Sequence, residues 1–205
     1  MLSIGITSNL KKYFKGYIDF IDHYWLDFFE KNKIKFYLIP NKKNLSKFFL
    51  KKINFLILTG GNDVIGNEKT SKIRNEIESH LIDICVKKKI PILGICRGAQ
   101  LLNQKFGGRV KKVKNQMRTR HDIYFIKNSL IKKKFLNVNS FHNYGIKKNG
   151  LAKKFQILAF DKSKNIEMFI SKNNKIIGTM WHPEREKNKK LLIYFINFLS
   201  KSWKL

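Results

Sequence analysis

The 205-residue chain carries 43 lysines and arginines against 14 aspartates and glutamates, a formal net charge of +29. Its length suits one domain over residues 1–205, and two cysteines are too few for a disulfide scaffold, which favours a reducing, cytoplasmic location. Lysines spread along the whole chain supply most of the charge, which argues against nucleic-acid binding. No apolar run approaches the roughly 20 residues that a membrane span needs.

The first half of the chain alternates predicted strands and helices. This alternation predicts a mostly parallel sheet with helices on both faces, whose ligands bind beyond the carboxyl ends of the strands. In chain order, we expect strands over 2–7 and 35–39, helices over 17–31 and 45–50, a strand from 53 that runs into a glycine loop at 60–63, a helix over 70–88, a strand over 90–95 and a helix over 97–106.

The second half has weaker periodicity and favours short strands separated by Lys- and Asn-rich turns. Together with the first half, it predicts an α/β fold of three layers, flavodoxin-like, with a small β-rich flank. We expect strands over 121–126, 136–138, 156–160, 166–170 and 175–180, followed by a closing helix over 186–200.

A strand-to-helix turn surrounds one of the two cysteines. Gly94-Ile95-Cys96-Arg97-Gly98 has the G-x-nucleophile-x-G pattern, which raises the central side chain above the sheet edge while the glycines let strand and helix approach closely. Because Cys96 then stands at a helix N-terminus, the helix dipole favours its thiolate. The backbone amide of Arg97 can point at an oxyanion.

A base for that thiol is predicted in Trp181-His182-Pro183-Glu184, which also follows an apolar strand. Pro183 favours an extended backbone at His182, so the side chains of His182 and Glu184 project to the same side. The carboxylate can then orient the imidazole, which predicts a Cys96-His182-Glu184 triad. A lone cysteine or histidine is usually a packed structural residue, and Cys85 keeps that interpretation.

Three segments, LTGGND, GICRGAQLLN and WHPE, occur in this order and resemble the signatures of class I glutamine amidotransferase domains and the related γ-glutamyl hydrolases. The resemblance implies thiol attack on a γ-glutamyl amide through a thioester, without metal or organic cofactor. It also implies an oxyanion hole formed by the amides of Gly61 and Arg97, and a glutamyl contact from Gln100.

Several sequence details resemble those of the free-standing γ-glutamyl hydrolase branch, and of the γ-glutamyl-CDP-amidate hydrolases of capsule biosynthesis in particular. These details are Arg97, the Gly60–Asp63 loop, the NSFHNYG segment and the RTRH segment. The resemblance implies an anionic, nucleotide-linked substrate bound by Asn62, Ser140, His142 and Asn143, with Arg118 and Arg120 at the diphosphate. Solvated loop positions are the alternative for these two arginines.

Two other functions stay open at this point. A glutaminase subunit that supplies ammonia to a separate synthase would share the triad, and a polyanion-binding protein on an inactive scaffold would account for the charge. The sequence does not fix the leaving group of the substrate or the oligomeric state.

Overall fold

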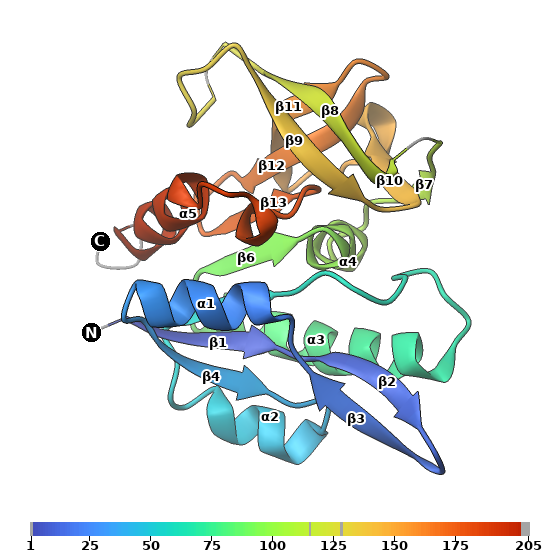
Figure 1. Cartoon of the computed structure of the whole chain (residues 1–205), viewed down its shortest axis with the longest axis vertical. Coiled ribbons are helices and arrows are strands. Elements are labelled where there is room, and N and C mark those ends of the chain that lie inside the picture. Colours follow the sequence, from blue (N-terminus) through green and yellow to red (C-terminus); the bar gives the residue numbers. More distant parts are fainter. Residues whose placement is uncertain (1, 115, 128, 202–205) are drawn as a thin grey trace.

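The computed structural model describes residues 2–114, 116–127 and 129–201. Five parallel strands form the centre of the main sheet, in the order β4-β1-β5-β6-β13 (Figure 1). Numbered along the chain, these strands have the flavodoxin-like order 2-1-3-4-5, as the sequence predicts. Their bounds are Ser3–Thr7 (β1), Lys35–Ile39 (β4), Phe55–Leu58 (β5), Ile92–Ile95 (β6) and Ile176–Thr179 (β13).

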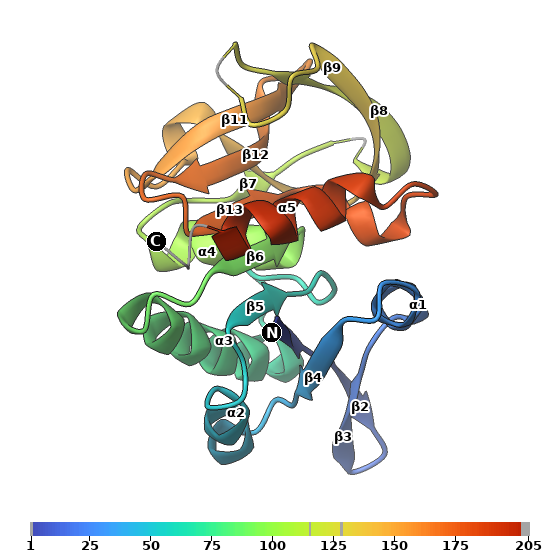
Figure 2. The ribbon, with the colours of Figure 1, turned by 90° about the vertical axis from the view of Figure 1, so that its left-hand side faces the viewer.

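Helices cover both faces of this sheet, because successive strand residues point to opposite sides. Phe55 and Ile57 pack in one core cluster with residues of α1 (His23–Lys31) and α5 (Lys190–Lys201). Leu56 and Leu58 pack in a second cluster, against α3 (Lys69–Lys87) and α4 (Arg97–Lys105). The short α2 (Lys43–Phe49) lies beside α3, across the sheet from α1 (Figure 2). The three predicted layers are therefore present.

An antiparallel flank extends the sheet beyond β13, in the order β12-β11-β8-β9. It forms the upper part of Figure 1, and this confirms the predicted β-rich second half. The bounds are Met117–Phe125 (β8), Phe135–Phe141 (β9), Phe155–Asp161 (β11) and Asn165–Ser171 (β12). Two short strands, Lys111–Lys112 (β7) and Tyr144–Lys147 (β10), pair with each other, and β10 also pairs with β12.

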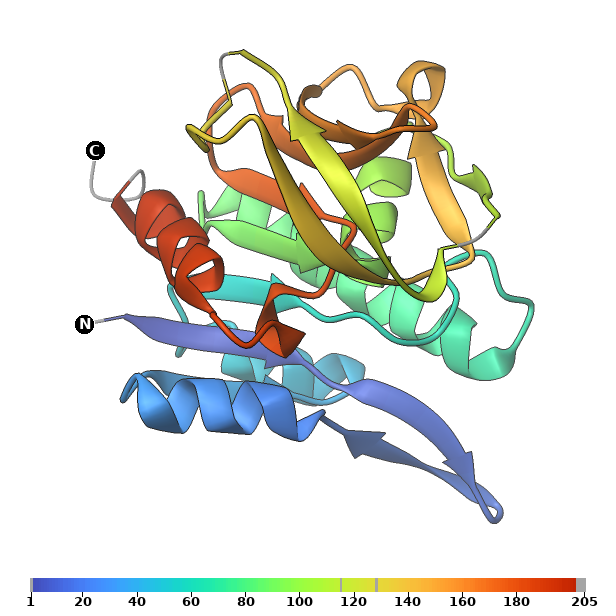
Figure 3. The same cartoon turned by 45° about the horizontal axis from the view of Figure 1, so that its top comes forward.

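The predicted helix over 17–31 is wrong in its first part. Residues Asn9–Tyr13 (β2) and Gly16–Phe20 (β3) form an antiparallel hairpin that protrudes from the body of the molecule (Figure 3). Ile18 and Ile21 share the helical spacing of Trp25 and Phe28, but only the last two are buried in the core. The helix begins at His23, where the Asp22 side chain caps it by accepting from the Tyr24 amide.

The closing helix also begins later than the sequence predicts. A short 3-10 turn at Pro183–Arg185 precedes it, with Pro183 at the first position, where proline is compatible with a helical turn. Helix α5 begins at Lys190, whose amide donates to the Asn188 side chain. Within the described ranges, every helix is too short or too polar to cross a bilayer.

Candidate active site

Cys96 occupies a sharp turn between β6 and α4. Its backbone has φ 50° and ψ −104°, in a region that L-residues rarely adopt, and this conformation ends the strand and begins the helix. A Cβ on Gly94 would lie 2.8 Å from the carbonyl carbon of Gly98, and a Cβ on Gly98 would overlap the carbonyl oxygen of Leu58. The elbow therefore requires both glycines, as its sequence pattern predicts.

His182 lies after β13, the strand that pairs with β6, so the parallel sheet brings it to the same edge as Cys96. Its Nδ1 is 2.6 Å from Oε1 of Glu184, and both side chains are almost completely buried. Asn139 of β9 holds the backbone of His182 at two points: its Nδ2 donates to the carbonyl of His182 at 2.8 Å, and its Oδ1 accepts from the amide at 2.9 Å.

The imidazole and the thiol meet beside Gly60. A Cβ on Gly60 would lie 2.5 Å from Cε1 and 3.3 Å from Nε2 of His182, and 3.5 Å from Cβ of Cys96. Burial lowers the pKa of His182, but the charges of Glu184 and Cys96 and hydrogen bonds to them outweigh it and raise this pKa to about 10. The arrangement thus favours an imidazolium next to the thiol at neutral pH.

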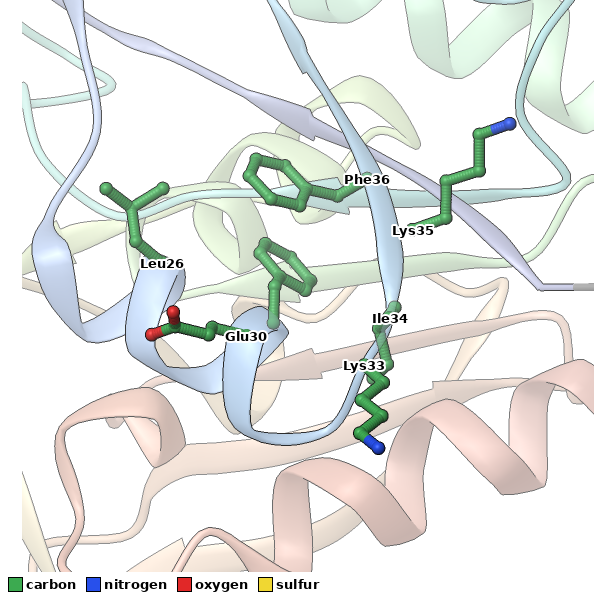
Figure 4. Close-up of a pocket in the computed structure, with 7 residues that line it drawn as sticks. Leu26, Glu30, Lys33, Ile34, Lys35 and Phe36 are labelled. Carbon is green, nitrogen blue, oxygen red and sulfur yellow. The ribbon is translucent and has the colours of Figure 1, made fainter.

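Two cavities of about 450 and 260 Å³ lie at His182, and both are lined by Gly61, Asn62, His182 and Arg185, whereas the buried Cys96 lines neither. The larger cavity is also lined by two carboxylates, Asp63 and Glu68, so its wall carries both signs of charge and suits a zwitterionic ligand. A third cavity of about 580 Å³ lies between α1 and β4, with Leu26, Glu30 and Phe36 on its wall (Figure 4). None of the predicted site residues lines it.

Three of the predicted binding residues line the cavities at the candidate site: Gly61, Asn62 and Asn143. Gly61 has φ 101°, a conformation that favours glycine. The side-chain Nδ2 of Asn62 donates to the carbonyl of Leu10, so this side chain also ties the glycine loop to β2.

Gln100, Ser140 and His142 lie deeper, and none of them lines either cavity. Gln100 donates to the carbonyl of Tyr144 at 2.8 Å, and the Ser140 hydroxyl donates to the carbonyl of Gln116 at 2.6 Å. His142 is 4% exposed. The side chains of Gln100 and Ser140 thus hold the segments that border the cavities.

The three predicted arginines have different surroundings. Arg97 is buried, and its side chain forms an ion pair with Glu78 and donates to Asn75. Arg120 is exposed on β8 and contacts Asn137 and Glu186. Arg118 is exposed on the same strand and has φ 54°. Neither Arg118 nor Arg120 lines the two cavities at the site.

Sequence reasoning missed two residues that the structure brings to the site. Asn139 opens the NSFHNYG segment, but the two-point contact with a backbone 43 positions away has no local signal. Arg185 directly follows Glu184 and lines both cavities, where its Nη2 is 3.0 Å from Asp22 and its guanidinium stacks 4.8 Å from the Phe141 ring. Its adjacency to WHPE is the one signal that could have identified it.

A second group of titratable side chains lies behind the site. Glu167 of β12 is fully buried, 3.5 Å from Nε2 of His121 and 4.0 Å from Nε2 of His142. Burial raises the pKa of Glu167 to about 7. For His121 burial lowers the pKa, but Glu167 outweighs this and raises it, whereas burial and the charges of His121 and His182 lower that of His142 to about 4.

The family model described as Peptidase C26 matches residues 4–184, which include the elbow, the glycine loop and the His182–Glu184 pair. The chain belongs to the Peptidase C26 family. A curated relative, the gamma-glutamyl-CDP-amidate hydrolase of Campylobacter jejuni, is 40% identical over 136 residues. This match covers 65% of the chain and 64% of the length of that relative.

One further curated relative and two solved structures are also similar to this chain. A glutamine-hydrolyzing GMP synthase subunit of Methanococcus aeolicus is 30% identical over 155 residues, covering 74% of this chain and 76% of that protein. A Thermoplasma acidophilum protein described as a GMP synthase subunit superposes with a TM-score of 0.78 at 22% identity, over 100% of this chain and 96% of that one. A glutamine amidotransferase of Thermotoga maritima gives a TM-score of 0.69 at 18% identity, over 98% and 90% of the two chains. The predicted fold class is thus confirmed.

We expect Gly60→Ala to reduce kcat/KM by about 100-fold without unfolding the protein, because the added methyl displaces the imidazole from the thiol. Gly60 is not among the described glycines with positive φ, so its backbone accepts alanine. Steady-state kinetics and thermal melting measure both effects. Gly16→Ala, whose Cβ would have its nearest neighbour at 3.9 Å, is the matched control, and equal activity of the two variants would contradict the placement of His182.

Glu167→Gln is expected to flatten the pH dependence of stability. Folding raises the pKa of Glu167 from 4.5 to about 7 and also raises that of His121, so the folded state holds these protons more tightly. The resulting stability is complete below pH 4.5 and is lost as the pH rises through 7. Between pH 5 and pH 8, the free energy of unfolding of the variant should rise relative to that of wild type by on the order of 2–3 kcal/mol.

Urea unfolding at the two pH values measures this gain. Glu76→Gln removes an exposed carboxylate on α3 and serves as the control. A constant difference between Glu167→Gln and wild type across this range would show that Glu167 ionises normally in the folded protein.

Proposed function

We propose that this protein is a cysteine-dependent hydrolase of γ-glutamyl amide bonds and that its substrate is γ-glutamyl-CDP-amidate, cleaved to glutamate and cytidine diphosphoramidate. The observation that carries the proposal is the convergence of Cys96 and the His182–Glu184 pair beside Gly60, at the carboxyl ends of adjacent parallel strands. The 40% identity to a gamma-glutamyl-CDP-amidate hydrolase supports this choice of substrate.

The geometry supports the following chemistry. The Cys96 thiolate attacks the γ-carbonyl carbon, and the amides of Gly61 and Arg97 stabilise the oxyanion. His182, protonated and oriented by Glu184, donates a proton to the departing nitrogen as the C–N bond breaks. Water then attacks the thioester with His182 as its base, which releases glutamate and restores the thiol.

The polar cavities fit the two ends of such a substrate. Asp63 and Glu68 suit the α-ammonium group of the glutamyl moiety. Arg185 faces both cavities and is the cation that we assign to the diphosphate, since a guanidinium binds phosphate oxygens by charge-assisted hydrogen bonds. Arg120 lines neither cavity, which leaves it a secondary role. Both cysteines are free, which fits a reducing, cytoplasmic compartment.

Purified protein should convert synthetic γ-glutamyl-CDP-amidate, with both products visible by phosphorus NMR and a glutamate assay. Cys96→Ala should lose at least about 10⁴-fold in kcat because it removes the nucleophile. Cys85→Ala is the matched control, since burial raises the pKa of the Cys85 thiol to about 12 and makes it unreactive.

Two results would redirect the proposal. Efficient turnover of glutamine without turnover of the nucleotide amide would favour an ammonia-supplying subunit, the role that the similarity to GMP synthase subunits suggests. Full activity of Cys96→Ala would contradict the proposed mechanism. The polyanion-binding alternative would then be tested by measuring whether the protein binds DNA and whether the affinity falls with salt.

The pH profile tests the role of His182. Because its pKa is raised to about 10 in the free protein, the proton donor stays charged through neutral pH, and kcat/KM, which reports ionisations of the free enzyme, should fall only as the pH approaches 10. Glu184→Gln removes a main cause of the raised pKa, so the alkaline limb should move to lower pH and kcat should fall by roughly 10²–10⁴-fold. Glu30→Gln on α1 is the control, and an unmoved limb in Glu184→Gln would assign it to another group.

A further inference from the structure

Glu78 of α3 is fully buried between two arginines. Its Oε1 is 2.9 Å from Nη2 of Arg74, one helical turn away, and its Oε2 accepts a short hydrogen bond from Nη1 of Arg97 on α4. All three side chains are at most 1% exposed. One carboxylate therefore joins two guanidinium groups that belong to different helices.

The two arginines extend this link to the two loops of the site. Arg97 directly follows Cys96 and is the first residue of α4. Arg74 reaches the glycine loop, where its Nη1 donates to the carbonyl of Gly60 at 3.2 Å and to Oδ1 of Asn62 at 3.0 Å. Gly61 lies between these two contacts. The same Nη1 is 2.8 Å from Oδ1 of Asn9, and Nη2 is 3.1 Å from Oγ1 of Thr59.

The buried charges of this cluster are poor candidates for a net contribution to the stability of the fold. Burial, reinforced by the neighbouring charge of Arg97, lowers the pKa of Arg74 to about 10 although Glu78 opposes this shift. Burial raises the pKa of Glu78, but the charges of the two arginines outweigh the effect of burial, so the pKa is lowered overall. Because desolvating such ions offsets much of their attraction, apolar residues of similar volume could fill the same space at equal stability. The directional contacts of the two guanidinium groups suit a different role, which is to fix the positions of the groups that they join.

We propose that Glu78 is a positioning residue that fixes the separation of the two oxyanion amides, acting through Arg74 on the Gly61 loop and through Arg97 on the elbow. This inference rests on the proposed function, which places the oxyanion between the amides of Gly61 and Arg97. Stabilisation by such donors depends on their spacing around the tetrahedral oxygen, so a loss of alignment lowers kcat and leaves substrate binding nearly unchanged.

A tetrahedral mimic separates alignment from general damage. The Cys96 thiolate adds to the carbonyl carbon of a γ-glutamyl aldehyde, forming the S–C bond while the C=O electron pair moves to oxygen and gives an oxyanion without a leaving group. Glutamate has a planar carboxylate and serves as the ground-state probe. Protection of Cys96 from iodoacetamide reports binding of both compounds without any turnover.

Glu78→Gln keeps the shape and removes the charge. We expect a 10- to 100-fold loss in kcat and an equal loss of aldehyde affinity, with glutamate affinity and KM changed less than twofold and with unchanged alkylation of Cys96 in the absence of ligand. Glu78→Asp, which restores the charge, should recover part of both losses. Glu76→Gln, on the same helix but exposed, is the matched control and should match wild type.

A combined variant, Arg74→Met with Glu78→Leu and Arg97→Met, replaces the cluster with apolar side chains, so it keeps the test open if Glu78→Gln fails to fold. It should fold and show the same selective loss of aldehyde affinity. Unchanged aldehyde affinity in either folded variant, or equal losses for aldehyde and glutamate, would overturn the inference. Because the aldehyde carries no leaving group, absence of turnover with the nucleotide substrate would refute the proposed function and leave this measurement intact.

Discussion

The backbone conformation of Cys96 is the constraint on which the rest of the site depends. With φ 50° and ψ −104°, this residue converts the direction of β6 into that of α4 within one position. Such a turn is tolerated only where neighbours determine it, and here Gly94, Gly98 and the hydrogen bond from the Cys96 amide to the Thr179 carbonyl do so. The thiol is thereby held at the sheet edge, next to the strand that leads to His182.

The two halves of the chain contribute in different ways. The parallel half supplies Cys96, the proposed nucleophile, and the glycine loop from the carboxyl ends of β6 and β5, where the topology places them together. The antiparallel half holds His182, the proposed base, because Asn139 on β9 fixes the backbone of His182 at two points. Behind both loops, the Arg74-Glu78-Arg97 cluster joins α3 to α4 through buried charge. The proposed site therefore lies where elements of both halves are joined by direct side-chain contacts.

Local patterns explain what the sequence could predict. The elbow and the His182–Glu184 pair depend on residues within a few positions of each other, so glycine and proline spacing indicates their geometry directly. The hairpin at residues 9–20 was predictable only with knowledge of burial, since Ile18 and Ile21 fit a helical period equally well. Contacts across long separations, such as Asn139 with His182 or Arg74 with Asn9, have no periodic signal. For Arg97 and Gln100, the motif predicts the position of the backbone. It does not predict the side-chain partners, which depend on tertiary packing.

The insertion of the whole β-rich flank between β6 and β13, which are neighbours in the sheet, has a consequence for biosynthesis. A ribosome releases the thiol-bearing corner long before the strand that carries the base, and the gap beside β6 closes only when β13 arrives. Until β13 has been made, the proposed nucleophile Cys96 lacks the residue that we propose as its proton partner. The proposed site is thus complete only after this last parallel strand joins the sheet.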